Sequence, residues 1–353
     1  MVITSPGRIC LFGEHQDYLG LPVIAAAISL RIKIEGDLRS DLDVHIDLPD
    51  IASKEIFSLE GDLSYENSSD YFKSGLNVMR KDGFTFSKGF NCAVQGNIPL
   101  QAGTSSSSAL TVSWINFLAN ISDQSEQLSP KTIADLAYKA EVVEFEQAGG
   151  VMDQNSISYG NLIYIDTHPS VKVKLLPYKL SKFVLGDSLE KKDTQSVLSN
   201  SKDKVLKVIN KIKQEYTNFS LKNAKHTDLE TFQMLDKSDI NLLKETLNNR
   251  DLTLKGFDLL INEKNNDQLI GNLLSQEHRI LRDSLKVSTP KIEKMLKAAK
   301  KAGALGGKIN GSGGGGCMFV YAPKNYKEVA KAIEDVGGKS YIINIDEGTK
   351  KHE

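Results

Sequence analysis

Serine residues at a helix start are the first feature of this chain that could do chemistry. Four consecutive serines, Ser105 to Ser108, follow the small-residue segment that begins at Pro99. The apolar residues after them recur at helical spacing, at Leu110, Trp114, Phe117, Leu118 and Ile121. The first N–H groups of a helix lack intrahelical partners and lie at its positive dipole end, so this segment suits a phosphate group. A serine-rich helix cap without a ligand is the alternative that the segment alone leaves open.

Charged residues before and after the serines could bind hydroxyl groups or move a proton. Glu14, His15 and Asp17 lie in a loop bracketed by glycines after the apolar strand that starts at Arg8. Carboxylates accept hydrogen bonds from sugar hydroxyls, and imidazole donates or accepts, although a solvated loop could also hold these groups. Asp153 follows two glycines and has apolar neighbours, which is compatible with a helix N-cap or with a placed base.

Two common nucleotide-binding motifs are disfavoured. No Gly-Lys-Ser or Gly-Lys-Thr occurs, so there is no Walker A loop. The glycine run Gly311 to Gly316 matches a dinucleotide fingerprint only because it is so glycine-dense, and it precedes a strand instead of a helix. Its glycines more plausibly let the backbone approach another loop or a ligand closely.

Composition excludes several partners and compartments. Lys plus Arg number 44 against 45 for Asp plus Glu, and the net charge of −1 gives no electrostatic case for binding nucleic acid. Three scattered cysteines are too few for a disulfide framework or a zinc site. No signal-like start or membrane-length apolar run is present, so we expect a cytoplasmic protein without membrane contact. We expect a monomer or a weak homo-oligomer.

The elements expected around these segments form an α+β pattern. Period-2 runs at 28–34 and 42–48 predict half-buried antiparallel strands, and 67–82 and 131–147 predict helices. Pro290 and Gly303 bracket a further helix whose lysines form a solvated face. A change of composition near residues 180 to 190 predicts two domains, over 1–185 and 186–353.

Several segments, in order along the chain, resemble the GHMP small-molecule kinases, and among them the galactokinases. The similar segments are Pro6 to Tyr18, which is close to the galactokinase signature around Gly-Glu-His-Thr-Asp-Tyr, Pro99 to Ala109, Gly150 to Gln154, His278 to Arg282 and Gly306 to Cys317. The resemblance implies a two-domain GHMP kinase fold. It joins an N-terminal ribosomal-protein-like βαβ domain, which carries ATP-phosphate binding and catalysis, to a C-terminal ferredoxin-like α+β domain with helical additions.

The same resemblance implies a role for each matching residue. Catalysis falls to Asp153, with Arg8 holding it ionised and stabilising the transferred charge. Sugar hydroxyls would be bound by Glu14, His15, Asp17, Tyr18 and Asp153. ATP phosphates would be held by Gly103, Ser105, Ser106, Ser107 and Ser108, with the phosphate loop backed by Gly311, Gly313 and Gly315. Mg²⁺ would be held by Ser107 and Glu141, with Glu144 a weaker candidate.

The implied activity is ATP-dependent phosphorylation of a monosaccharide hydroxyl, with ATP and Mg²⁺ as cofactors. Its expected acceptor is the anomeric hydroxyl of galactose or a related sugar. Arabinose, glucuronate, a heptose, N-acetylgalactosamine and mevalonate are the alternative acceptors. A sugar sensor that kept the fold and lost turnover is the alternative from another class of protein. The Glu-His-x-Asp and Met-Asp-Gln segments favour a sugar over mevalonate.

Overall fold

Two β-sheets organise the chain in the computed structural model, which describes residues 1–190, 194–262 and 266–352. The first sheet has eight strands, with the order β12-β1-β2-β5-β3-β4, and β6 pairs with β2 and β7. Its strands are β1 (Val2–Phe12), β2 (Val23–Leu38), β3 (Asp43–Leu48), β4 (Ser53–Ser58), β5 (Phe90–Gly96), β6 (Leu162–Asp166), β7 (Lys172–Leu175) and β12 (Lys350–His352). The second sheet has four strands in the order β11-β8-β10-β9. They are β8 (Phe183–Asp187), β9 (Gly306–Ile309), β10 (Cys317–Tyr321) and β11 (Lys339–Ile343).

Helices cover each sheet and define two lobes. Along one side of the first sheet lie α1 (Tyr71–Lys81), α2 (Ser106–Ile121), α3 (Pro130–Tyr138), the π-helix η3 (Lys139–Val143) and α4 (Met152–Tyr159), which complete the first lobe. The second lobe adds α5 (Thr194–Glu215), α6 (Lys237–Ile261), α7 (Asp267–Asp283), α8 (Pro290–Lys301) and α9 (Tyr326–Glu334). Short 3₁₀ turns are η1 (Asp17–Leu19), η2 (Pro49–Ile51) and η4 (His226–Thr231).

The strongest sequence patterns form the elements they predict. The serine segment does open a helix, α2, whose Trp114 is fully buried and packs edge-on against Phe72 and Phe90. The run 28–34 lies in β2, which is antiparallel to β1 and β5. The run 42–48 forms β3, which is antiparallel to β4 but parallel to β5, because β5 lies between β3 and β2. Pro290 stands at the first position of α8 behind the capping side chain of Thr289, as expected.

The division into lobes follows strand pairing, which the sequence pattern does not reveal. The predicted boundary between residues 185 and 186 falls inside β8, and β8 pairs with β10 and β11 of the second sheet. The last strand, β12, returns to pair with β1 of the first sheet. The predicted ranges, 1–185 and 186–353, therefore stay a prediction about domains, and strand pairing alone crosses their boundary.

One apolar core continues from the first lobe into the second. It contains Trp114 under the first sheet as well as Phe319 of β10 and Leu274 of α7. This shared core fixes the two lobes against each other and so positions groups that meet between them. Among the described residues, no helix is both long and apolar enough to cross a membrane.

Candidate active site

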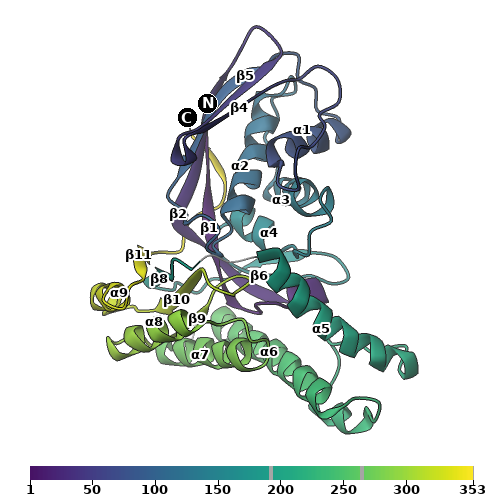
Figure 1. Cartoon of the computed structure of the whole chain (residues 1–353), viewed down its shortest axis with the longest axis vertical. Helices are drawn as coiled ribbons and strands as arrows, with labels where there is room; N and C mark the ends of the chain where they lie inside the picture. The colour runs from purple at the N-terminus through teal and green to yellow at the C-terminus, as the bar shows by residue number, and fades with distance from the viewer. Residues whose placement is uncertain (191–193, 263–265, 353) are drawn as a thin grey trace.

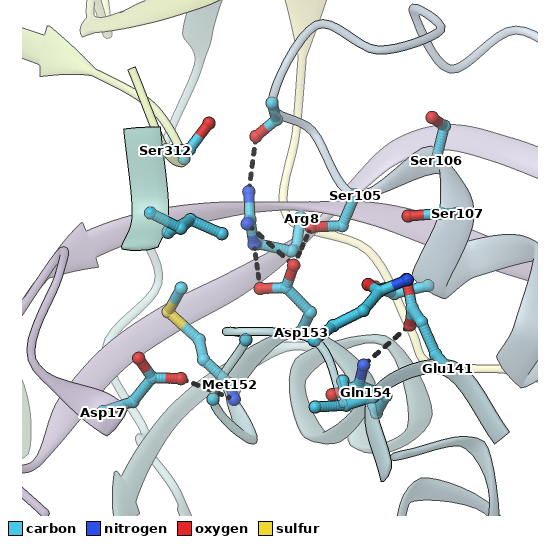
Figure 2. Close-up of a pocket in the computed structure, with 18 of the residues that line it drawn as sticks. Arg8, Asp17, Ser105, Ser106, Ser107, Glu141, Met152, Asp153, Gln154 and Ser312 are labelled. Carbon is cyan, nitrogen blue, oxygen red and sulfur yellow. Dashed lines mark hydrogen bonds and ion pairs between the residues drawn. The ribbon is translucent and has the colours of Figure 1, made fainter. Parts of the chain in front are cut away.

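A cleft of about 550 Å³ lies where the lobes meet. Both lobes contribute to it, because the starts of α2 and α4 face the loop after β1 and the glycine run between β9 and β10. The sequence-predicted residues among its lining are Arg8, Glu14, His15, Asp17, Tyr18, Gly103, Ser105, Ser106, Ser107, Ser108, Glu141, Asp153 and Gly311. The fold therefore brings together segments that lie up to 300 residues apart in the chain (Figure 2).

An ion pair between Arg8 and Asp153 forms the centre of the cleft. Arg8 Nε donates to Asp153 Oδ1 at 2.8 Å, and Nη2 donates to Oδ2 at 2.9 Å, which is the two-bond geometry that guanidinium and carboxylate groups favour (Figure 2). Burial alone would lower the pKa of Arg8, but the carboxylates of Asp153 and Glu14 outweigh it and raise this pKa. Arg8 therefore stays charged, while 26% of the Asp153 side chain remains accessible from the cleft.

The position of Asp153 excludes one of the two roles that the sequence left open, that of a helix N-cap. The N-cap residue of α4 is Val151, so Asp153 lies in the first turn of the helix and does not cap it. Its carboxylate instead accepts from Arg8 and from the hydroxyl of Ser105. A carboxylate held by a cation and open to a cleft can orient a hydroxyl group or take its proton.

The phosphate-loop serines differ in what their hydroxyls do. Ser105 has a left-handed backbone conformation (φ 58°) and donates its hydroxyl to Asp153, so this hydroxyl is occupied in the structure. Ser108 Oγ donates to Glu141 Oε1 at 3.0 Å. The first N–H groups of α2, from Ser106 to Ser108, remain without intrahelical acceptors at the positive end of the helix. The groups of this loop that are available to an anion are therefore mainly its backbone N–H groups, since the hydroxyls of Ser105 and Ser108 already donate to carboxylates.

Glu141 lies in the π-helix η3, which continues α3 with one extra residue per turn. The sequence predicted one continuous helix over 131–147, and the π-turn is a departure that aims Glu141 into the cleft. Burial raises the pKa of Glu141, although hydrogen bonds from Ser107, Gln154 and Ser108 oppose this. Within the described ranges no lysine or arginine lies within ion-pair distance of this buried carboxylate.

A divalent cation fits this arrangement. Mg²⁺ prefers oxygen ligands and keeps several waters, so a buried carboxylate beside the Ser107 hydroxyl provides a suitable partial ligand set. The described residues hold no cluster of three or more histidine, cysteine or acidic side chains that would bind a metal unaided. Glu144, the weaker candidate, instead accepts from Tyr65 at 2.6 Å and pairs with Lys81 at 2.7 Å. It does not line the cleft.

The loop after β1 presents the four predicted sugar-binding side chains along one wall of the cleft. Ring nitrogens of His15 lie 2.9 Å from the Tyr18 hydroxyl and 3.0 Å from the Ser312 carbonyl oxygen. Asp17 accepts from the N–H groups of Met152 and Tyr18. Burial and the nearby Asp153 raise the pKa of Asp17 to about 6.

Glycines at two positions are required by the contacts of this wall. A Cβ on Gly150 would fall 1.9 Å from Asp17 Oδ2. A Cβ on Gly311, whose φ is +75°, would fall 2.6 Å from the carbonyl oxygen of Gly103. The glycine run therefore lies directly behind the phosphate loop at Gly311.

The other two glycines predicted to support the phosphate loop behave differently. Gly313 lies against Val287, since a Cβ there would fall 2.6 Å from the Val287 carbonyl oxygen. Gly315 has a φ of +124°, which favours glycine whatever its neighbours.

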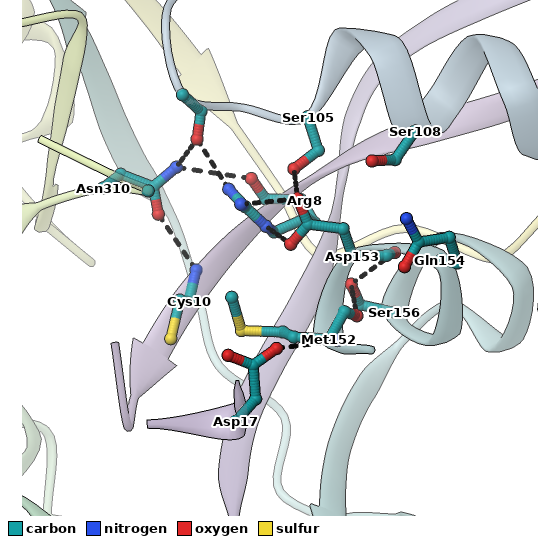
Figure 3. Close-up of polar contacts among 12 residues, drawn as sticks. Arg8, Cys10, Asp17, Ser105, Ser108, Met152, Asp153, Gln154, Ser156 and Asn310 are labelled. Carbon is teal, nitrogen blue, oxygen red and sulfur yellow. Dashed lines mark hydrogen bonds and ion pairs between the residues drawn. The ribbon is translucent and has the colours of Figure 1, made fainter. Parts of the chain in front are cut away.

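Sequence reasoning missed several residues that shape the site. Asn310 accepts from the Cys10 N–H at 3.0 Å and donates to the Gly103 carbonyl at 2.8 Å, which ties β1 to the phosphate loop (Figure 3). Lys308 and Glu277 are fully buried behind the wall that carries the predicted sugar-binding side chains. The one signal for Lys308 was a lone charged residue in an otherwise small and apolar segment.

Comparisons with known proteins agree on a family. The galactokinase galactose-binding signature matches residues 1–35, the GHMP kinases N terminal domain matches residues 70–161, and the GHMP kinases C terminal model matches residues 257–342. A mevalonate kinase of Pyrococcus furiosus is 27% identical over 364 residues, which cover 100% of this chain and 98% of that protein. A galactokinase of Clostridium perfringens is 29% identical over 366 residues, covering 98% and 93%.

The fold has the same relatives. A crystal structure of Lactococcus lactis galactokinase complexed with galactose superposes with a TM-score of 0.86 at 22% identity, covering 99% of this chain and 95% of that one. The chain belongs to the GHMP kinase family, and it has the two-domain fold of that family.

Proposed function

We propose that this protein phosphorylates a monosaccharide hydroxyl with ATP, giving a sugar phosphate and ADP. The acceptor that we propose is the anomeric hydroxyl of galactose or a related neutral sugar. The observation that carries the proposal is the Arg8–Asp153 pair, which faces the cleft beside the N-terminal end of α2. A placed carboxylate next to an anion-binding helix start is what phosphoryl transfer to a hydroxyl requires.

The nucleotide phosphates would lie at the start of α2. Gly103 has a φ of +88°, and its carbonyl oxygen is held by Arg8 and Asn310, so the loop before the helix is fixed before ATP arrives. The N–H groups of Ser106 to Ser108 would then bind phosphate oxygens without reorganisation. Glu141 and Ser107 would hold Mg²⁺, which neutralises phosphate charge when bound.

Proton transfer would occur at Asp153. The acceptor hydroxyl gives its proton to a carboxylate oxygen of Asp153 while its oxygen forms a bond to the γ-phosphorus. The bond between the γ-phosphorus and the bridging oxygen breaks, and ADP leaves with that electron pair. Arg8 stabilises both the ionised carboxylate before transfer and the negative charge on the transferring group.

The charge of the cleft supports a neutral acceptor. Among the described residues that line it, Arg8 is the one lysine or arginine, against the acidic residues Glu14, Asp17, Glu141 and Asp153. Three of the five N–H groups of the Arg8 guanidinium are already donated to Asp153 and Gly103, so its charge is paired with Asp153. A carboxylate on the acceptor, as in mevalonate or glucuronate, would meet no free cation there, and an unpaired buried charge is unfavourable.

Mevalonate remains the second candidate acceptor, because the Pyrococcus furiosus mevalonate kinase matches the whole chain. An ADP-release assay with ATP and Mg²⁺ separates the candidates. The panel contains galactose, arabinose, N-acetylgalactosamine, a heptose, glucuronate and mevalonate. We expect turnover with a neutral sugar, and loss of the reducing end in its product would identify the anomeric phosphate.

Three other results would contradict the proposal. Turnover of mevalonate alone would assign the second candidate. Turnover of glucuronate in preference to the neutral sugars would overturn the charge argument. Tight sugar binding without any turnover would make the protein a sensor.

A further inference from the structure

A buried ion cluster lies behind the wall of the cleft that we propose binds the sugar. Lys308 Nζ is 2.8 Å from Glu14 Oε2 and 3.9 Å from Glu277 Oε1. Lys308 and Glu277 have no exposed surface, and Glu14 is 2% exposed. Of the three, Glu14 alone lines the cleft.

Side chains of the second lobe also hold the backbone of this wall. The N–H groups of Gly13 and Glu14 both donate to Glu277 Oε1, at 3.0 and 2.9 Å. Lys308 Nζ donates to the Cys10 carbonyl oxygen at 2.8 Å. Asn249 Nδ2 donates to the Glu14 carbonyl oxygen at 3.0 Å. A loop of the first lobe is thus fixed by α6, α7 and β9.

The two oxygens of the Glu14 carboxylate have different hydrogen-bond partners. Oε2 accepts from Lys308 and from the Gly311 N–H at 2.9 Å. Oε1 accepts no hydrogen bond within the part of the chain that the structure describes. One oxygen therefore anchors the residue, and the other is left for a ligand.

A buried cluster of this kind contributes little net free energy to the stability of a fold. Taking a lysine and two carboxylates out of water costs more than their attraction commonly returns, so buried ion pairs are weak evidence for a purely stabilising role. Burial raises the pKa of Glu277 to about 7, and Oε2 of Glu277 has no hydrogen-bond partner among the described residues. A role in setting the geometry of the wall explains why the cluster is there.

We propose that Lys308 and Glu277 are positioning residues that set acceptor affinity by holding Glu14 and the Gly13–Glu14 backbone. Neither residue lines the cleft in which we place the acceptor and the nucleotide. Because the inference rests on the proposed sugar kinase function, its test needs one readout that depends on activity and one that does not.

The kinetic test separates the Michaelis constants of the two substrates in the full-length protein. In Glu277→Leu both N–H groups lose their acceptor, and we expect the KM for the sugar to rise at least ~10-fold. The KM for ATP should change less than about threefold. Glu277→Gln keeps a carbonyl oxygen that can accept both N–H groups, so it should stay within about threefold of the wild type in both constants.

Lys308 gives an independent pair of variants. Lys308→Met leaves Glu14 Oε2 without its cation, and the sugar KM should again rise at least ~10-fold. Lys308→Arg keeps a buried cation and should recover most of the affinity. The matched control is Arg31→Met. It also removes a cation with several partners, Asp346, Thr4 and Gly348, but Arg31 does not line the cleft. It should lower thermal stability without changing the sugar KM.

Hydrogen–deuterium exchange gives the readout that needs no substrate. In Glu277→Leu, peptides that contain Gly13 and Glu14 should exchange faster than in the wild type, while peptides from the start of α2 stay protected. Arg31→Met should leave both regions unchanged. If the wild type phosphorylates no sugar, the proposed function fails, and this exchange pattern still tests the positioning role.

Either of two outcomes would overturn the inference. The first is an equal rise of both Michaelis constants in Glu277→Leu and Lys308→Met. The second is unchanged exchange at Gly13 and Glu14 when Glu277 is replaced by leucine.

Discussion

The two walls of the cleft are built in different ways. The first, which we propose binds the nucleotide and call the nucleotide wall, presents backbone groups of consecutive residues at the start of one helix, with Glu141 beside them. The second, which we propose binds the acceptor and call the acceptor wall, consists of side chains on an irregular loop, held in place by Glu277, Lys308 and Asn249 from the other lobe. The binding groups of the first wall come from local helix structure, although Arg8 and Asn310 hold the carbonyl oxygen of Gly103 before it. The second wall depends throughout on contacts between residues 235 to 294 positions apart in the sequence.

Because of this difference, acceptor specificity can change at the acceptor wall while phosphoryl transfer is retained. A phosphate cradle made of N–H groups tolerates side-chain variation, because the helix start supplies the binding groups. An acceptor wall made of placed side chains changes with any residue that moves them. Members of one kinase family that act on galactose or on mevalonate are consistent with a kept nucleotide wall and a varied acceptor wall.

Asp153 lies between the walls, and its replacement should have the largest effect. Asp153→Asn removes the proton acceptor and leaves Arg8 without its charge partner, so we expect kcat to fall by at least ~10²-fold with the fold intact. Steady-state kinetics and thermal unfolding check this. Asp166→Asn is the control, since it removes a carboxylate paired with Lys222 outside the cleft. Near-normal turnover in Asp153→Asn would reject Asp153 as the catalytic residue.

What the sequence could predict follows the same division. The serine helix, the cleft residues that lie in a family motif and the glycine run at Gly311 were foreseeable, because local spacing or that motif marks them, whereas lining residues such as Tyr71 and Leu198 were not. The ion cluster was not foreseeable, since nothing local to Glu14 indicates that Lys308 and Glu277 reach it from 294 and 263 residues away. The membership of β8 in the second sheet and the π-turn at Glu141 likewise depend on long-range pairing and packing, which periodicity does not encode.

Replacing Glu141 tests the Mg²⁺ site that we propose at the nucleotide wall. Glu141→Gln keeps the shape but removes the charge, so the Mg²⁺ concentration for half-maximal activity should rise at least ~10-fold. A Mg²⁺ titration at saturating ATP and sugar measures this. Glu144→Gln is a matched control on the same segment, because Glu144 pairs with Lys81 away from the cleft. Equal Mg²⁺ requirements in the two variants would exclude Glu141 as a ligand.

Substitutions at two glycines of the same run, Gly311 and Gly313, should affect nucleotide binding and fold stability differently. Both Gly311→Ala and Gly313→Ala place a Cβ at a positive φ and against a carbonyl oxygen, which costs about 1–3 kcal/mol each. In Gly311→Ala the displaced oxygen belongs to Gly103, so the KM for ATP should rise about tenfold. In Gly313→Ala it belongs to Val287, so stability should fall while the KM for ATP holds. The opposite assignment of the two effects would place the nucleotide elsewhere.

Asp17 should give the smallest and most pH-dependent effect, on the acceptor wall. Its pKa is raised to about 6 from an ordinary value of 3.8, so the folded protein holds this proton more tightly than the unfolded chain. Raising the pH from about 4 to 6 therefore lowers stability, and the full penalty is present above pH 6. Asp17→Asn removes the penalty and should stabilise the fold by about 3 kcal/mol at pH 7. That gain should disappear as the pH falls to 4.

The same substitution should also lower the affinity of the acceptor wall for sugar. Asp17 would then favour sugar binding while it lowers the stability of the fold. The ionised Asp17 carboxylate accepts hydrogen bonds from sugar hydroxyls better than an amide does, so Asp17→Asn should raise the sugar KM about threefold at pH 7. In the wild type the sugar KM should fall as the pH rises through 6, and in Asp17→Asn it should stay flat. Denaturant unfolding and sugar KM measured from pH 5 to pH 8 test both effects. A stabilised variant with an unchanged sugar KM would mean that Asp17 faces the cleft without binding the acceptor, and the acceptor wall would then narrow to Glu14, His15 and Tyr18.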